Sequence, residues 1–323
     1  MRAKGGWGTG PPVVAMGGGH GLAASLRALR RVTDRVTAVV GVSDDGGSSG
    51  RIRKEFGLIP PGDLRMALAA LCGDDTWGRT WSKVLQHRFA GDGELAGHAV
   101  GNLLISALWQ ETGDVVDGLD WVAALLEAQG RVLPVVREPL DLVAQVRGLD
   151  GPDTVTTLRG QVDIATTSGE VISLSIEPAD PQPCEQVLDA IDSAGMIVLG
   201  PGSWFTSVLP HLYVKQVHDA VLASDAVRVL VINVMPEAGE TSGFTAARYV
   251  DNLADTFPQL RIDWVVVDPK AVVDEAALRA ACDRLQAAPV VEEVRAAADT
   301  GPKPGHDTLL LASVFQRLLT PSG

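Results

Sequence analysis

The sequence predicts an α/β fold with a Rossmann-like, mostly parallel sheet and helices on both faces. Apolar, β-branched runs at residues 13–16 and 36–42 are each followed by a glycine-rich loop and then a helix-like segment. A tight loop at residues 200–203 follows another apolar run in the same way. The carboxyl ends of parallel strands meet at one edge of a sheet, where open α/β folds bind their ligands. We therefore expect a nucleotide-type ligand in a crevice at that edge.

The composition supports one large folded unit. The chain has 323 residues, of which 46% are hydrophobic and 21% are charged, enough for a sizeable core. The net charge of −13 disfavours a nucleic-acid partner, because such binding starts from clustered Lys and Arg. Cys72, Cys184 and Cys282 are widely separated, which is typical of a reduced cytoplasm and not of a disulfide framework. No apolar run is long enough for a membrane span, so a cytoplasmic location is expected.

We expect a single domain over residues 13–319. Residues 1–12 are rich in glycine and proline and predict a flexible N-terminus, and residues 320–323 predict a flexible tail. Within the domain, the first strand is followed by a helix over 22–31, which has an apolar face at helical spacing.

The middle of the domain departs from the strand–helix alternation. Residues 62–130 read as helical almost throughout and predict a helical insertion into the sheet protein. Residues 131–177 predict a small β meander, because short β-like runs are separated by turn clusters. Those runs lie at 132–136, 140–147, 154–157 and 171–176.

The strand–helix alternation resumes in the last third of the chain. Helices are predicted at 183–193, at 207–223 with a break near Pro210, at 244–256 and at 308–319. Strands are predicted at 196–199, 228–234 and 262–267, and the last of these is expected to be the final core strand.

The first glycine-rich loop consists of Gly17, Gly18, Gly19, His20 and Gly21. Glycines let the backbone approach a ligand closely, and the N-terminus of the next helix attracts negative charge. The spacing differs from the dinucleotide pattern G-x-G-x-x-G, so the loop alone is a weak indication and a plain strand–helix turn stays open. His20 either donates to phosphate or points to solvent.

The second loop, residues 43–51, is the stronger indication of a ligand site. Asp44 and Asp45 offer oxygens to ribose hydroxyls, to a base or to Mg²⁺. Arg51 offers a bidentate fork for phosphate. The alternative is an exposed turn in which Asp44 acts as a cap. Further donors in this loop are expected at Gly46, Ser48 and Ser49.

Two later segments add polar residues that the same edge would bring together. Asp63 and Arg65 follow Pro60-Pro61-Gly62, where the alternative is helix initiation with Asp63 as the N-cap. Asn102 lies beside Gly101 in an apolar helical pattern, and a buried, hydrogen-bonded amide is the alternative to a ligand contact.

The third loop and the strand after it complete the predicted edge. Ser203 lacks the G-x-S-x-G setting of a hydrolase nucleophile. The six histidines show no metal-ligand spacing, so no metal site is predicted. The candidate ligand-binding residues in this part of the chain are Gly200, Gly202, Ser203, Thr206, Asn233 and Glu240.

Together these motifs resemble those of the gluconeogenesis factor family, a branch of the CofD-like superfamily that also contains 2-phospho-L-lactate transferase. The resemblance extends from about residue 13 to 319. It is carried by GGGHGL at 17–22, SDDGGSSGR at 43–51, PPGDLR at 60–65, GHAVGNLL at 97–104, LGPGS at 199–203, FTSVLP at 205–210, NVM at 233–235 and GET at 239–241. Two positions depart from the family pattern: His20 stands where Thr is usual, and Met66 stands where Asn is usual.

The resemblance implies a Rossmann-like core with a helical insertion. The gluconeogenesis-factor branch is similar to proteins that bind UDP-sugars, notably UDP-N-acetylglucosamine, and support cell shape and wall synthesis during growth on gluconeogenic carbon. No cofactor is required in that branch. The transferase branch moves a phospholactyl group from a nucleotide diphosphate carrier to a deazaflavin precursor with Mg²⁺. The unbroken loop at 43–51 and the turn at 60–65 favour the gluconeogenesis-factor branch.

The leading hypothesis is therefore a cytoplasmic UDP-sugar-binding regulator. The loops at 17–21 and 200–203 would hold the diphosphate. Expected partners beyond the ligand are proteins of cell-wall synthesis or kinases, and a second copy of the chain. In this hypothesis Asp44 and Asp45 read ribose or uracil, Arg51 and Arg65 neutralise phosphate, and Asn102, Asn233 and Glu240 line the pocket.

Two enzyme hypotheses stay open beside it. A Mg²⁺-dependent phospholactyl-type transferase would use Asp44, Asp45 or Asp63 to hold the metal at the diphosphate. An NAD(P) dehydrogenase is disfavoured by the loop spacing and by the absence of a His/Asp pair for hydride transfer.

Overall fold

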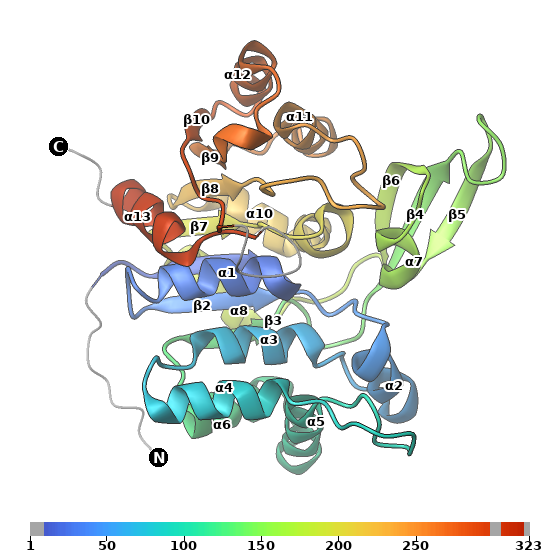
Figure 1. Ribbon diagram of the computed structural model, residues 1–323, viewed down its shortest axis with the longest axis vertical. Coiled ribbons are helices and arrows are strands. Elements are labelled where there is room, and N and C mark those ends of the chain that lie inside the picture. Colours follow the sequence, from blue (N-terminus) through green and yellow to red (C-terminus); the bar gives the residue numbers. More distant parts are fainter. Residues whose placement is uncertain (1–9, 298–304, 320–323) are drawn as a thin grey trace.

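The computed structural model describes residues 10–297 and 305–319, and its centre is a parallel sheet of seven strands (Figure 1). The strand order is β10-β9-β8-β7-β1-β2-β3, and every pair of neighbours is parallel. The predicted α/β fold is therefore confirmed. The strands are β1 Val13–Gly17, β2 Val36–Val40, β3 Arg131–Pro134, β7 Met196–Leu199, β8 Val227–Val231, β9 Trp264–Val267 and β10 Ala288–Val291.

The central strands read as continuous apolar runs because helices cover both faces of the sheet. All residues of β1 and β7 are buried. Helix α1 (Gly19–Leu29) packs against α3 (Gly62–Leu71) and α13 (Thr308–Leu319), and these three cover the near face in Figure 1. The chain runs from β7 to β8 in the direction opposite to β1 to β2, so a right-handed crossover puts α10 (Lys215–Ala223) on the other face. There it packs against α8 (Glu185–Asp192).

The predicted helical insertion is the connection from β2 to β3. Its second helix, α3, packs against α1 and the sheet, so it also serves as the crossover helix. The caps explain two helix starts: Asp75 accepts from the Gly78 N–H, and Asp114 accepts from the Val116 N–H. The other helices of this connection are α2 Gly47–Phe56, α4 Thr76–Gln86, α5 Val100–Thr112 and α6 Val115–Leu126.

A separate antiparallel sheet has the order β5-β4-β6, with β4 Asp141–Arg147, β5 Val155–Arg159 and β6 Glu170–Glu177. Buried and exposed residues alternate along β4, as a half-buried strand requires. Helix α7 (Gln161–Ala165) connects β5 to β6. Two details of the expected meander were wrong. Its first run, at 132–136, forms β3 of the parallel sheet, and β4 lies between the other two strands.

The C-terminal part continues the parallel sheet beyond the predicted last strand. The prediction that 262–267 is the final core strand was wrong, because β10 pairs with β9 at the edge. This strand is short, partly exposed and contains Pro289, so it lacks the apolar signal of a core strand. The helix expected at 207–223 is broken near Pro210, as predicted. The remaining helices are η1 Trp204–Val208 (a π-helix), α9 Pro210–Tyr213, α11 Ala246–Thr256, η2 Pro269–Ala271 and α12 Glu275–Arg284.

Several expectations concern the termini, the cysteines and the membrane. Residues 1–9 of the expected flexible N-terminus and the tail 320–323 lie outside the described residues. The three cysteines are buried and free. Within the part of the chain that the structure describes, every helix is too short or too polar to cross a membrane.

Candidate ligand-binding crevice

The crevice lies where the strand order reverses, between β1 and β7. From β1 the chain proceeds to β2 on one side, and it later returns to place β7 on the other side. The loops that leave these two strands are therefore neighbours, which is where open α/β sheets bind ligands. A Cβ atom on Gly21 would clash with the Pro201 carbonyl and come within 2.7 Å of Gly202 Cα. The first and third predicted loops are thus in direct contact.

The start of α3 closes the crevice from a third direction. A Cβ atom on Gly18 would clash with the Asp63 carboxylate, so the first loop can approach α3 this closely only as glycine. A Cβ atom on Gly62 would clash with the Ser49 hydroxyl and lie 2.8 Å from Asp44 Oδ2. The structure therefore brings the first loop, the second loop and the start of α3 together.

Asp63 lies between a backbone donor and another carboxylate. Desolvation and, second, the negative charge of Asp44 together raise the pKa of Asp63 to about 7. The Gly19 backbone N–H and the Arg65 guanidinium act in the opposite direction. Asp63 is therefore poised to change charge near neutral pH at the wall of the crevice.

Arg65 is a buried cation with unused donors. It is only 3% exposed, and its Nε and Nη1 atoms have no hydrogen-bond partner among the described residues. Burial lowers its pKa to about 10, with the charge of Arg88 second, while Asp63 and Asp44 oppose that shift. Gly101 makes room for this side chain, because a Cβ atom there would lie 2.8 Å from Arg65 Cγ. A guanidinium buried in this way is strongly disfavoured unless an anion joins it.

A buried polar network joins α2 to the start of α5. Ser48 Oγ lies 3.0 Å from His98 Nδ1 and accepts from Asn102 Nδ2 at 3.0 Å and from the Ala99 N–H at 3.4 Å. Because the hydroxyl accepts twice, it donates its own proton to His98 Nδ1, which leaves the ring proton on Nε2. Desolvation lowers the pKa of His98, which favours this neutral ring. The Asn102 Oδ1 atom is buried and has no partner within the described chain.

The third loop is held mainly by the protein itself. The Asn233 side chain accepts from the Gly202 N–H and donates to the Gly202 carbonyl, both at 2.9 Å. Glu240 Oε1 accepts from the Phe205 N–H at 3.1 Å. Burial raises the pKa of Glu240 to about 8, with the charge of Glu237 second, and the Phe205 N–H opposes that shift. The hydroxyl of Thr206 is buried and lacks a partner among the described residues.

Three other candidate residues are exposed. Asp45 is exposed, and its Oδ1 accepts from the Val162 N–H, which attaches the second loop to α7. Arg51 is exposed and donates to the carbonyls of Glu94 and Ala96 at 3.4 and 2.8 Å. His20 is exposed at the start of α1. These three residues frame the crevice and are not part of its buried polar cluster.

Sequence reasoning did not single out His98 as a site residue, although it lies in the GHAVGNLL segment at 97–104. Its role depends on a contact with Ser48, 50 residues earlier, and no local sequence pattern predicts that contact. Gly46, which was expected as a ligand donor, forms the turn given as the alternative, because its N–H donates to Asp44 Oδ1 at 3.0 Å.

Comparisons with known proteins agree with this architecture. A family model for the 2-phospho-L-lactate transferase CofD matches residues 13–303. A putative gluconeogenesis factor of Mycobacterium tuberculosis is 47% identical over 308 residues, which cover 94% of this chain and 89% of that protein. The gluconeogenesis factor of Listeria monocytogenes is 35% identical over 267 residues, covering 83% and 80%.

The fold is also shared with a solved structure. A member of the UPF0052 family from Bacillus halodurans superimposes with a TM-score of 0.84 at 31% identity, covering 95% of this chain and 98% of that one. The chain therefore belongs to the gluconeogenesis factor family within the CofD-like proteins.

Proposed function

We propose that this protein binds a nucleotide sugar of the UDP-N-acetylglucosamine type in the crevice between β1 and β7, and acts as a regulator of cell-wall synthesis during gluconeogenic growth. The proposal is supported by the position of the crevice at the strand-order reversal and by the gluconeogenesis factor relatives.

The observation that carries the proposal is the buried guanidinium of Arg65. Its two unpaired nitrogens need an acceptor, and a diphosphate supplies several charged oxygens to a planar guanidinium. The loops at 17–21 and 200–203 contact each other, and Gly18 of the first loop lies against Asp63, two residues before Arg65. Asp44 and Asp63 lie beside it and offer acceptors for ribose hydroxyls.

The test is calorimetric titration of the purified protein with UDP-N-acetylglucosamine, with and without Mg²⁺, using NAD and GDP as controls. We expect binding of the UDP-sugar without metal. Arg65→Met should weaken it at least about tenfold, since a charge-assisted hydrogen bond is lost. Arg279→Met on α12 is the matched control, because that side chain is exposed and pairs only with Glu275 in its own helix. Equal affinities of the two variants would contradict the assignment of Arg65.

A transferase of the phospholactyl type is the second candidate, favoured by the proximity of Asp44 and Asp63. The charge of Asp44 contributes to the raised pKa of Asp63, and Mg²⁺ commonly binds one or two carboxylates together with substrate phosphates. No larger group of metal-ligating side chains gathers anywhere in residues 10–297 and 305–319. Binding of GDP only with Mg²⁺, together with product formation on a deazaflavin acceptor, would favour this candidate over the regulator.

The regulatory role further implies a cytoplasmic protein that contacts other proteins. We include in the proposal a cell-wall synthesis protein or a kinase as partner, and self-association as a dimer. Support for the location comes from three free, buried thiols. Light scattering of the purified protein with and without UDP-sugar tests the dimer directly.

A further inference from the structure

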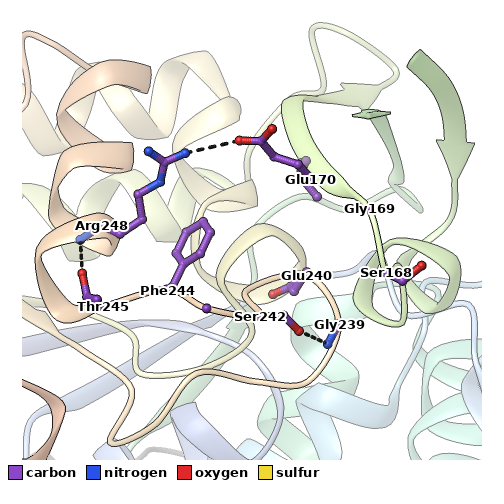
Figure 2. Close-up of a pocket in the computed structure, with 11 residues that line it drawn as sticks. Ser168, Gly169, Glu170, Gly239, Glu240, Ser242, Phe244, Thr245 and Arg248 are labelled. Atoms are coloured by element: carbon purple, nitrogen blue, oxygen red, sulfur yellow. Dashed lines mark hydrogen bonds and ion pairs between the residues drawn. The ribbon is translucent and has the colours of Figure 1, made fainter. Parts of the chain in front are cut away.

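A second cavity lies beside the crevice, between the start of β6 and the segment that leads into α11. Its volume is about 540 Å³, within the range of small-molecule sites. Figure 2 shows the two walls facing each other, with Glu170 on one and Arg248 on the other. The lining residues are Ser168, Gly169, Glu170, Val171, Gly239, Glu240, Ser242, Gly243, Phe244, Thr245 and Arg248.

Glu240 is the buried polar group of this cavity. It is 3% exposed, and its Oε2 atom has no hydrogen-bond partner in the described part of the chain. Its other oxygen accepts from the Phe205 N–H of η1, the helix that follows the third loop of the crevice. The carboxyl of Glu240 therefore links the wall of this cavity to the third loop of the crevice, where the Thr206 hydroxyl and the Trp204 N–H are further donors near it.

The walls of the cavity offer polar groups of both signs. Arg248 pairs with Glu170 at 3.4 Å, and its Cζ atom lies 5.7 Å from the centroid of the Phe244 ring. Glu170 also pairs with Arg147 at 3.4 Å. The hydroxyls of Ser168 and Ser242 add groups that both donate and accept.

We propose that this cavity binds an uncharged, hydroxyl-rich group of the sugar type. Sugar hydroxyls both donate and accept, so they suit a carboxyl, a guanidinium and serine hydroxyls at once. A cationic ligand is disfavoured because the Arg248 guanidinium already lies over the Phe244 ring. An anionic ligand is disfavoured by the exposed carboxylate of Glu170, which already pairs with the Arg248 guanidinium. The raised pKa of Glu240 agrees with a neutral carboxyl that donates to a hydroxyl.

The sugar has two sources that the same chemistry would recognise. It is either the sugar group of the ligand in the crevice, in which case the inference rests on the proposed function, or a free sugar. Glu240 and α7 connect the two sites, since the Glu240 N–H donates to the Ala165 carbonyl and Asp45 binds the Val162 N–H.

The test compares UDP, UDP-N-acetylglucosamine and free N-acetylglucosamine as ligands of the full chain by calorimetry and ligand-observed NMR. Two variants remove different sides of the cavity: Glu240→Leu deletes the buried carboxyl, and Arg248→Met deletes an exposed guanidinium at little risk to folding. Arg279→Met is the matched control outside the cavity. Thermal unfolding verifies that each variant is folded.

If the sugar belongs to the nucleotide ligand, wild type binds UDP-N-acetylglucosamine more tightly than UDP. Arg248→Met should then lose about tenfold affinity for the UDP-sugar and none for UDP, whereas Glu240→Leu, which also removes a contact of the third loop, should weaken both. If the sugar is separate, wild type binds UDP and the UDP-sugar equally, and free N-acetylglucosamine binds to wild type but not to Arg248→Met.

If wild type binds neither nucleotide, the proposed function fails. Binding of the free sugar is then the only test of the cavity as a sugar site. Binding of the free sugar that Arg248→Met abolishes would still support the cavity as a sugar site. Equal affinity for UDP and UDP-sugar without free-sugar binding, or affinities that Arg248→Met leaves unchanged, would overturn it.

Discussion

The two sides of the crevice satisfy their polar groups in different ways. On the side formed by the first two loops and α3, Arg65 keeps two unpaired nitrogens and Asn102 keeps an unpaired oxygen, both buried. On the side formed by the third loop, Asn233 binds both backbone groups of Gly202, and Glu240 binds the Phe205 N–H. The third-loop side also has two buried atoms without a close partner among the described residues, the Thr206 hydroxyl and Glu240 Oε2. Of the two sides, however, only the α3 side holds a buried cation with unpaired donors, Arg65. Buried polar groups without partners are costly, and most so when charged, so Arg65 indicates where an anionic ligand supplies the missing contacts.

The two sides should therefore contribute differently to ligand affinity and to the stability of the free protein. Groups that wait for a ligand should contribute to binding and little or nothing to the stability of the free protein. Groups that are paired within the chain should contribute mainly to stability. Four substitutions test this division, beginning with the largest expected effect.

Asn233→Ala should destabilise the protein by about 1–3 kcal/mol, because it leaves the buried N–H and carbonyl of Gly202 without partners. Arg65→Met should have no such cost, since it removes a buried charge that is already unpaired. Urea unfolding of both variants without ligand measures the difference. Equal losses of unfolding free energy would show that the two sides do not differ as described.

The pH dependence of binding comes next in size and concerns Asp63. Its pKa is about 7 in the folded protein against an ordinary value of 3.8, so the folded state holds the proton more tightly. Stability from this group therefore falls as pH rises from about 4 to about 7. An anionic ligand should bind several-fold more tightly at about pH 6 than at about pH 8, because a protonated Asp63 no longer repels it.

Asp63→Asn should remove that pH dependence, as titrations at the two pH values would show. The direction in which ligand affinity changes with pH also distinguishes the two candidate functions. A site that needs Mg²⁺ on Asp63 would lose affinity at low pH, because the proton competes with the metal. Tighter binding at about pH 8 than at about pH 6 would thus contradict the metal-free regulator.

The sequence predicted the strands and loops that form the site, but it did not predict contacts between residues far apart in the chain. The apolar runs before each glycine loop placed β1, β2 and β7, and parallel strands then bring their loops to one edge. By contrast, Asp45 binds Val162, which is 117 residues away, and Ser48 binds His98 from another helix. The second cavity joins segments about 70 residues apart, near 168–171 and 239–248. Strand β10 was missed because an edge strand needs no continuous apolar run.

The smallest expected effect separates two arginines that the sequence could not tell apart. Both Arg51 and Arg65 follow acidic residues in loops of the same edge, and both suit phosphate. Arg51, however, is exposed and already donates to the carbonyls of Glu94 and Ala96.

Arg51→Met should therefore change nucleotide affinity by about twofold or less and stability by ~0.5 kcal/mol, as is usual for an exposed polar contact. Titration of this variant beside Arg65→Met, which differs only in position, makes the comparison direct. A loss for Arg51→Met as large as that for Arg65→Met would mean that the guanidinium turns from the 94–96 carbonyls to the ligand. The segment at 94–96 would then be released on binding, and the crevice would be bounded by a ligand-dependent contact there.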